Sequence, residues 1–275
     1  MRRQVGELDV MSEYRSVPAT ERPAMDQINR AMYTKDSVAT VFAWARILQE
    51  SERVILTMIE PEIRGKSILD IGIGGGRTTR FLSGLTTRYV GIDYSPAMVE
   101  AARRSFAMFS IYCCDARDMR RFPDDAFDFI LFSFNGLDYM PHADRLTALR
   151  EIYRVLAPAG LFMFSSHNRS GDAAKAPWNQ RSRQLSLRFT KACIKAMAAM
   201  PRHWRMRRHE IRENEYAILN DSALGYSLMT YYIDVSSQIA QLASVGFVDA
   251  RAFDALGRVT TEDRESLWVH YLARK

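Results

Sequence analysis

Cysteine is scarce in this chain, with three residues among 275, and two of them, Cys113 and Cys114, are adjacent. Adjacent cysteines do not easily pair with each other, and the third, Cys193, makes the count odd. The sequence therefore predicts no disulfide framework and no zinc site, because the spacing typical of zinc ligands is absent. A reducing, cytoplasmic location is expected.

Long apolar runs are also missing. No run approaches the roughly 18 residues that span a membrane, and residues 1–15 are charged without the apolar core of a signal peptide. We expect neither a membrane span nor a signal peptide. The hydrophobic content of 47% and the charged content of 25% are typical of a globular protein that buries a core.

Positive charge is distributed unevenly. Residues 171–225 contain eleven Lys or Arg and five Asp or Glu, so this segment has the net charge of +6 that the whole chain has. Three interpretations are open: a lid that binds an acidic substrate, a surface for an anionic membrane or for RNA phosphates, or a solvated face without a partner.

One stretch organises the rest of the sequence. Residues 66–76 read KSILDIGIGGG, in which a short apolar run suits a buried parallel strand. The glycines that follow suit a tight turn with close backbone approach, and residues 77–82 are compatible with a helix. Strand, glycine turn and helix open a nucleotide-type binding fold.

An acidic residue follows the next predicted strand. Residues 89–92 form a short apolar run that ends at Asp93, which can accept hydrogen bonds from both hydroxyls of a ribose. Further strands are predicted at residues 111–114, 127–134 and 161–164, and a last pair at 247–254 and 266–273. Helices are predicted at 38–60 with a break near 50–52, at 96–104, at 145–156, at 185–200 and after Asp234.

The segments LDIGIGGG and YVGIDYS resemble motifs I and II of the class I S-adenosylmethionine-dependent methyltransferases. A dinucleotide-binding dehydrogenase would have a third glycine at position 77, where Arg77 stands. The resemblance covers roughly residues 65–170 and 230–273. It implies an α/β fold, a Rossmann-like three-layer sandwich with a seven-stranded, mostly parallel sheet and a helical insertion between strands 5 and 6.

The resemblance also implies a division of the chain. Residues 1–60 would form an N-terminal helical arm that covers the cofactor, residues 61–170 and 226–275 the Rossmann-like core, and residues 171–225 a basic helical cap. The cofactor would be S-adenosylmethionine, with S-adenosylhomocysteine as product and no metal. Cofactor contacts are expected from the following residues: Asp70, Gly72, Gly74, Gly76, Arg77, Asp93, Tyr94, Met98, Asp115, Ala116, Ser133 and Phe134.

The reaction implied is an in-line methyl transfer to an oxygen or nitrogen of a small molecule, in which alignment of the reactants is the main task of the protein. His167 is the first candidate for a general base, because it follows the fifth strand and the ordinary pKa range of a histidine side chain suits a base, and Asp138 and His142 are the next. Substrate contacts are expected from Asn135, Tyr139, Asn168 and Tyr231.

Two alternatives are kept beside this interpretation: an NAD-dependent oxidoreductase, and a methyltransferase-like domain that binds its cofactor without turnover and docks to an anionic partner. A nucleic-acid substrate is not expected, because residues 134–137 read FNGL in place of an Asn/Asp-Pro-Pro-Tyr/Phe motif. The basic segment is compatible with an acidic small-molecule substrate. The sequence does not predict the oligomeric state.

Overall fold

The computed structural model describes residues 24–33, 47–171, 187–222, 224–262 and 265–275, with residues 187–196 described as helical backbone. The strands are β1 Ile68–Ile71, β2 Tyr89–Asp93, β3 Ser110–Cys113, β4 Phe127–Phe132, β5 Leu156–Asn168, β6 Ile211–Arg212, β7 Tyr216–Leu219, β8 Thr230–Ile233, β9 Val248–Phe253, β10 Val259–Thr260 and β11 Trp268–Arg274. The helices are α1 Ala24–Tyr33, α3 Glu50–Ile63, α4 Thr79–Leu82, α5 Pro96–Ser105, α6 His142–Val155, α7 Leu187–Met206 and α8 Val235–Val245, with 3-10 turns η2 Gly136–Tyr139 and η5 Arg207–His209.

All eleven of these strands belong to one mixed sheet, whose main order is β10-β9-β11-β5-β4-β1-β2-β3. The strands from β3 to β5 are mutually parallel, and β11 and β9 complete the sheet as an antiparallel pair. The register aligns Ile71 with both Ile92 and Phe132, so β1, β2 and β4 end at the same edge. The predicted Rossmann-like α/β class is confirmed.

The expected count of seven strands is wrong for the described residues. Strands β6 and β7 come from the segment predicted to be a helical cap, and β7 pairs with β8. Strand β8 in turn pairs with the last residues of β5, His167 and Asn168, which extend beyond the end of β4. The 171–225 segment therefore adds strands to the sheet as well as contributing α7; residues 172–186 lie outside the described residues.

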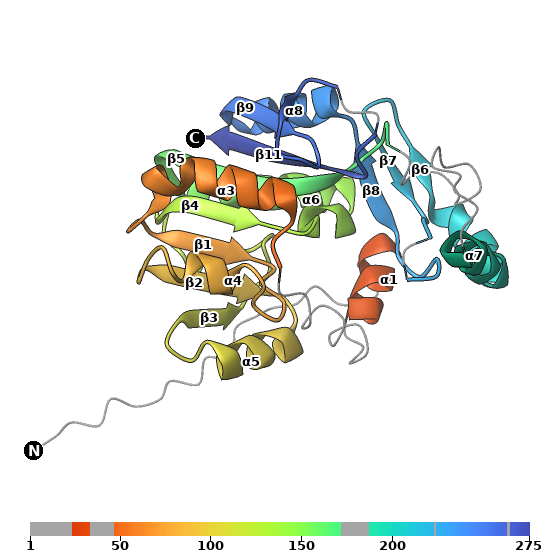
Figure 1. Ribbon diagram of the computed structural model, residues 1–275, viewed down its shortest axis with the longest axis horizontal. Coiled ribbons are helices and arrows are strands. Elements are labelled where there is room, and N and C mark those ends of the chain that lie inside the picture. The colour runs from red at the N-terminus through yellow and green to blue at the C-terminus, as the bar shows by residue number, and fades with distance from the viewer. Residues whose placement is uncertain (1–23, 34–46, 172–186, 223, 263–264) are drawn as a thin grey trace, which may run out of the picture.

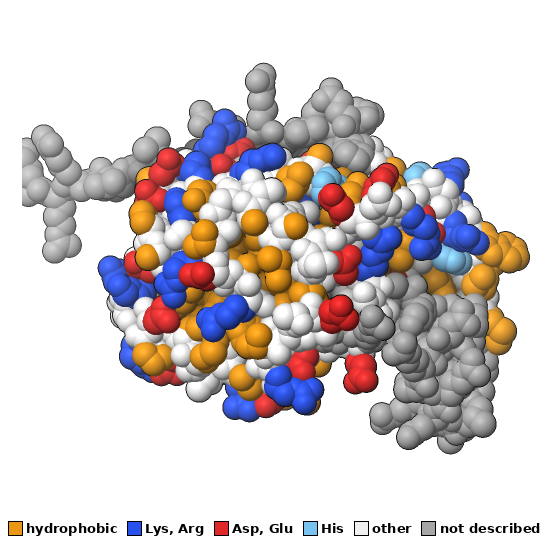
Figure 2. Space-filling model, turned by 90° about the horizontal axis from the view of Figure 1, so that it is seen from above, with side chains coloured by type: hydrophobic (Ala, Val, Ile, Leu, Met, Phe, Trp, Pro, Cys, Tyr) orange, Lys and Arg blue, Asp and Glu red, His pale blue; other side chains and the backbone are white. Residues whose placement is uncertain are grey.

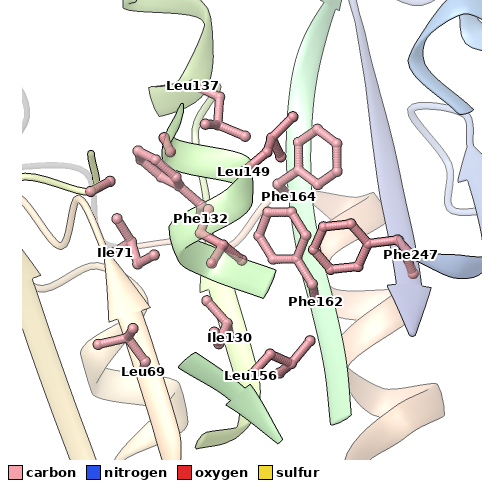
Figure 3. Close-up of a cluster of buried hydrophobic side chains, with 14 of the residues drawn as sticks. Leu69, Ile71, Ile130, Phe132, Leu137, Leu149, Leu156, Phe162, Phe164 and Phe247 are labelled. Atoms are coloured by element: carbon pink, nitrogen blue, oxygen red, sulfur yellow. The ribbon is translucent and has the colours of Figure 1, made fainter. Parts of the chain in front are cut away.

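Helices pack on both faces of the sheet (Figure 1). On one face, Ile55 and Ile59 of α3 join Ile68, Phe129 and Met163 of the sheet. On the other, α6 and α8 contribute to the cluster drawn in Figure 3, where the Phe162 and Phe164 rings stack at 4.8 Å. Strands buried on both faces explain the continuous apolar runs of the sequence.

The N-terminal segment divides into two roles. Helix α3 packs against a face of the sheet rather than wholly at the carboxyl edge of the strands, and the expectation that residues 1–60 cover the cofactor stays a prediction. Helix α1 is the part that lies at that edge, where the Asn29 side chain donates to the Tyr139 and Met229 carbonyl oxygens at 3.0 and 2.8 Å. The first part of the predicted 38–60 helix lies outside the described residues.

Several predicted boundaries move. Pro61 and Pro201 were expected to end helices, but both lie inside them, in α3 and α7. Strand β5 begins at Leu156, five residues before the predicted 161–164 strand, and its first part is irregular, with Ala159 at φ 62° and a register shift against β4. The helix after the glycine turn is a single turn, α4. None of the helices in the described parts of the chain is long and apolar enough to cross a membrane.

Helix α8 ends at Gly246, which has φ +117° and whose added Cβ would lie 2.9 Å from Cζ of Tyr153. We expect Gly246→Ala to lower the free energy of unfolding by about 1–3 kcal/mol, because an L side chain is strained in this conformation. Urea denaturation measures the change. Gly84→Ala is the control, since Gly84 lacks a positive φ and its Cβ would meet only the Phe81 carbonyl oxygen at 3.4 Å; equal losses in both variants would contradict the argument.

Candidate functional site

A cavity of about 160 Å³ lies at the carboxyl edge of β1, β2, β3 and β4. It is lined by residues from the ends of these strands and by four residues of α1. Of the residues expected to contact the cofactor, ten line it: Gly72, Gly74, Arg77, Asp93, Tyr94, Met98, Asp115, Ala116, Ser133 and Phe134. Tyr139, expected to contact the substrate, lines it too. The sequence therefore predicted most of the wall contributed by the sheet.

The glycine turn forms the floor of the cavity. Gly72 and Gly74 have φ +68° and +52°, and their backbone N–H groups donate to the Ile92 carbonyl oxygen and to Oδ2 of Asp93. Gly76 does not line the cavity: it has φ +88°, and an added Cβ would lie 2.3 Å from the Phe106 ring. Position 76 requires a glycine because a side chain there would clash with Phe106, the residue after α5, and not because a ligand approaches it.

Asp93 connects the turn to β2. Its Oδ1 accepts the Ser95 N–H at 2.8 Å and its Oδ2 accepts the Gly74 N–H at 3.0 Å. A carboxylate offers about four acceptor positions, so acceptor capacity remains for hydroxyl groups of a ligand in the cavity. Burial raises the pKa of Asp93, and a hydrogen bond to its charged form would offset that cost.

Asp70 is fully buried and does not line the cavity, unlike the expectation. Its Oδ2 accepts hydrogen bonds from Thr78 Oγ1 at 2.7 Å and from the Tyr89 hydroxyl at 2.8 Å. Burial raises its pKa to about 7. Asp70 therefore holds the start of α4 and the start of β2 together beneath the glycine turn.

Asp115 forms ion pairs with two arginines. Arg117 donates to it through Nε at 2.9 Å and through a terminal nitrogen at 2.6 Å, and Arg30 of α1 pairs with the same carboxylate. Both arginines also pair with Asp26, and the Arg30 guanidinium lies 4.9 Å from the centroid of the Tyr94 ring. The charges of this end of the cavity are thus compensated within the protein.

Helix α1 is the main feature of the cavity that sequence reasoning missed. It contributes Asp26, Asn29, Arg30 and Tyr33 to the lining. The one local signal was the spacing of Asp26 and Arg30, which is that of an ion pair on a helix. Such spacing does not reveal that Arg30 also reaches Asp115, 85 residues away.

Arg77 is held by Glu52, which the sequence analysis did not identify. The Arg77 guanidinium donates to both carboxylate oxygens of Glu52 and to Ser133 Oγ, and both members of the pair are buried. Burial alone would raise the pKa of Glu52, but the hydrogen bonds and charge of Arg77 outweigh it and lower that pKa. Where Arg77 lines the cavity, its positive charge is therefore neutralised by the ion pair with Glu52.

Asp138 and His167 form a buried dyad. Asp138 Oδ2 lies 2.7 Å from Nδ1 of His167 and accepts the His167 backbone N–H at 2.6 Å. The other oxygen, Oδ1, accepts from the fully buried Arg145 at 2.6 Å and from Ser166 at 2.7 Å. Neither His167 nor Asp138 lines the cavity, but the His167 ring centroid lies 6.1 Å from that of Tyr139, which does.

The remaining candidates lie elsewhere. His142 stacks on Tyr216 at 4.2 Å and its Nδ1 lies 2.8 Å from the Tyr231 hydroxyl, so these residues pack at the junction of α6 with β7 and β8. Asn135 is buried at φ +58°, and Asn168 donates to the Ser266 carbonyl oxygen. The structure does not bring His142, Asn135, Asn168 or Tyr231 to the cavity.

Metal-ligating groups do not gather in the described ranges: no cluster of three or more His, Cys, Asp or Glu side chains there could hold a metal ion. The expectation of no metal remains a prediction for the protein as a whole.

Comparisons with known proteins bear on this fold and site. Residues 68–160 match the family described as "Methyltransferase domain". In this segment the chain is similar to methyltransferase domains, and its sheet has the Rossmann-like order described above. The segment includes β1 to β4, the glycine turn, Asp93 and Asp115, which carry the cavity described above.

Two curated relatives of the chain illustrate the extent of the similarity. The malonyl-[acyl-carrier protein] O-methyltransferase of Halorhodospira halophila is 34% identical over 41% of this chain and 39% of its own length. The chloroplastic tocopherol O-methyltransferase of Arabidopsis thaliana is 31% identical over 56% of this chain and 49% of its own length. The matches thus span half or less of these relatives.

Solved structures share the fold over more of the chain. The 1,6-didemethyltoxoflavin-N1-methyltransferase of Burkholderia thailandensis, solved with S-adenosylhomocysteine, covers 94% of this chain at a TM-score of 0.57 and 14% identity, with 91% of its own chain covered. An S-adenosylmethionine-dependent methyltransferase from Mesorhizobium loti covers 82% at a TM-score of 0.57 and 20% identity, with 98% of its own chain covered. At these identities the likeness concerns the fold.

The burial of Asp70 predicts a dependence of stability on pH. Its pKa of about 7 in the folded protein lies above the ordinary value of 3.8, so the folded state retains the proton more strongly. Its contribution to stability is therefore complete below about pH 4 and is lost as the pH rises towards 7. We expect the free energy of unfolding of Asp70→Asn, minus that of the wild type, to increase between pH 4 and pH 7.

Urea denaturation of both proteins across this range measures that difference, in which the titration of all other groups cancels to first order. Asp128→Asn, at a half-buried carboxylate that accepts the Ser67 N–H, is the control. A constant difference between Asp70→Asn and wild type would show that Asp70 does not titrate in this way.

Proposed function

We propose that this protein transfers a methyl group from S-adenosylmethionine to an oxygen or nitrogen of a small-molecule acceptor. The observation that carries the proposal is the cavity in which the glycine turn, Asp93 and Asp115 lie together at the carboxyl edge of parallel strands. Ligands of open α/β sheets bind at this edge. The Burkholderia structure, which holds a small heterocycle with S-adenosylhomocysteine, supports the same reaction class.

The residues present fit an adenosine-containing cofactor. Gly74 has no atoms within 4 Å of the position of an added Cβ, so the backbone is open to close approach. In the proposal, Asp93 accepts hydrogen bonds from the ribose hydroxyls, Tyr94 contacts the adenine ring, and Asp115 with the backbone of Ala116 recognises the adenine edge. Arg77, Ser133 and Phe134 belong to the methionine end.

When bound, the cofactor supplies a methyl group on a positively charged sulfur, which is an activated leaving group. The protein then has to orient the acceptor, exclude water and receive a proton where the acceptor loses one. A hydrogen bond donated by Nδ1–H of His167 to the Asp138 carboxylate would leave the lone pair of Nε2 to accept a proton. His167 is therefore the proposed base, and Asp138, held by Arg145, is its positioning residue.

The oxidoreductase alternative would use the same edge for NAD. Arg77 occupies the position of the third glycine in that fingerprint, and its side chain is engaged with Glu52. The other alternative, a domain that binds S-adenosylmethionine without turnover, would use the same cavity and transfer no methyl group. A cofactor titration separates the oxidoreductase from the other two possibilities, and a screen of acceptors separates those two from each other.

We expect the protein to bind S-adenosylhomocysteine and not NADH in calorimetric titrations, and Asp93→Ala to weaken that binding by roughly 10- to 100-fold, because hydrogen bonds to a charged group contribute about 1.5–3 kcal/mol. Asp93 also binds the Gly74 N–H, so circular dichroism must show that the variant is folded. Asp124→Ala, at an exposed carboxylate, is the matched control. Binding of NADH instead would refute the proposal.

For an acceptor found by screening a panel of small molecules for methyl transfer, we expect His167→Gln to lower kcat by about 10²–10⁴-fold while S-adenosylhomocysteine affinity is unchanged. A general base also predicts that the acidic limb of the wild-type pH–rate profile disappears in the variant. His142→Gln is the control, because His142 packs away from the cavity. An unchanged profile would remove His167 from the reaction.

A further inference from the structure

The surface around the C-terminal half of α7 exposes large apolar side chains. Trp204 is 67% exposed, Met197 is 58% exposed, and Ile211, which follows η5, is 42% exposed. Met197 and Trp204 are seven residues apart on one helix, so they lie on the same side of it. Exposed apolar side chains that gather on one element indicate an interaction site rather than scattered surface residues.

The same element is strongly basic. Arg205, Arg207 and Arg208 are exposed beside Trp204, and we call these three arginines with Met197, Trp204 and Ile211 the Trp204 surface. Figure 2 shows basic, histidine and apolar side chains together at the end of the molecule that carries α7. Opposing charge is limited: Glu210 pairs with Arg212, and Glu213 and Glu215 lie between β6 and β7.

The charge of the chain as a whole indicates a negatively charged partner. The segment 171–225 has the net charge of +6 of the entire protein, and the remaining residues are balanced. A basic excess confined to one segment of the chain is not needed for general solubility, and it attracts an anionic surface over about a Debye length.

The surface is firmly attached to the body of the protein. Arg202 donates to the Gly225 carbonyl oxygen at 3.0 Å and to Ser227 Oγ at 2.8 Å, and Met206 packs on the cluster that contains Met25 and Met229. Because Met25 belongs to α1, a partner bound at the Trp204 surface would lie close to the helix that lines the cavity.

We propose that the Trp204 surface binds the surface of an anionic lipid bilayer. Amphipathic helices with Trp on the apolar side and Arg on the polar side lie in the headgroup region, where the indole and the guanidinium groups both find favourable surroundings. This occupant explains the apolar and the basic side chains together, and it is independent of the proposed methyl transfer.

Other partners would account for fewer of the side chains of the Trp204 surface. RNA phosphates would pair with the arginines and leave Met197 and Ile211 without a role. A second copy of the chain across a two-fold axis would bring like charges together. Residues 172–186 contain Lys175, Arg181 and Arg183 against one acid, Asp172, so their charge has the same sign as that of the surface.

Cosedimentation of the full-length protein with vesicles tests the proposal. We expect binding to vesicles of phosphatidylcholine mixed with phosphatidylglycerol, weak binding to phosphatidylcholine alone, and a loss of binding at high salt. The triple variant Arg205→Ala, Arg207→Ala, Arg208→Ala should bind about 100-fold more weakly, on the basis of the typical contribution of arginines near an anionic leaflet. Trp204→Ala should bind about tenfold more weakly, because it removes apolar burial.

Controls are Arg120→Ala, at an exposed arginine, and Met108→Ala, at an exposed large apolar residue, both away from α7; both should bind vesicles as the wild type does. Circular dichroism and S-adenosylhomocysteine titration of each variant show whether the fold and the cavity persist. Absence of binding to anionic vesicles, or equal binding by the triple variant, would overturn the proposal.

Two further results would assign the surface to another occupant and equally overturn the proposal. One is tighter binding of polyuridylic acid than of vesicles, lost in the triple variant. The other is a dimer in sedimentation velocity that dissociates on Trp204→Ala.

Discussion

The parallel register of β3, β2, β1 and β4 is the constraint on which the rest of the structure depends. Ile71 is paired with Ile92 on one side and Phe132 on the other, so the residues that follow these strands emerge at one edge. The glycine turn, Asp93, Asp115 and Phe134 are thereby brought into one cavity, although they span more than 60 residues of the chain.

Charge compensation is the second principle of the site. An unpaired buried charge is costly, and four buried carboxylates here are matched by arginines: Asp26 and Asp115 by Arg30 and Arg117, Glu52 by Arg77, and Asp138 by Arg145. These pairs also join elements, because Arg30 belongs to α1, Glu52 to α3 and Arg145 to α6. The same ion pairs therefore compensate the charges around the cavity and hold these helices in place.

The candidate site was predictable in part. The strand-end residues Asp93, Tyr94 and Asp115 could be found because each follows a short apolar run, and they line the cavity. The candidates His142, after the fourth strand, and Tyr231, before the last helix, could not be placed by the same reasoning, and they pack with Tyr216 away from the cavity. A histidine next to a strand end has no local property that distinguishes a position in the cavity from one in a neighbouring cluster.

The sequence by itself determined the strands of the core, the glycine turn and the acids that follow the strands, because apolar periodicity and backbone requirements are local properties. Only the tertiary structure decided that α1 closes one side of the cavity, that Asp138 is shared by His167 and Arg145, and that β6 and β7 extend the sheet through β8. Several of these contacts join residues far apart in the chain, such as Arg30 with Asp115 and Asp138 with His167. Their energy comes from pairing buried charges and backbone groups across that separation, which leaves no periodic signal in either segment.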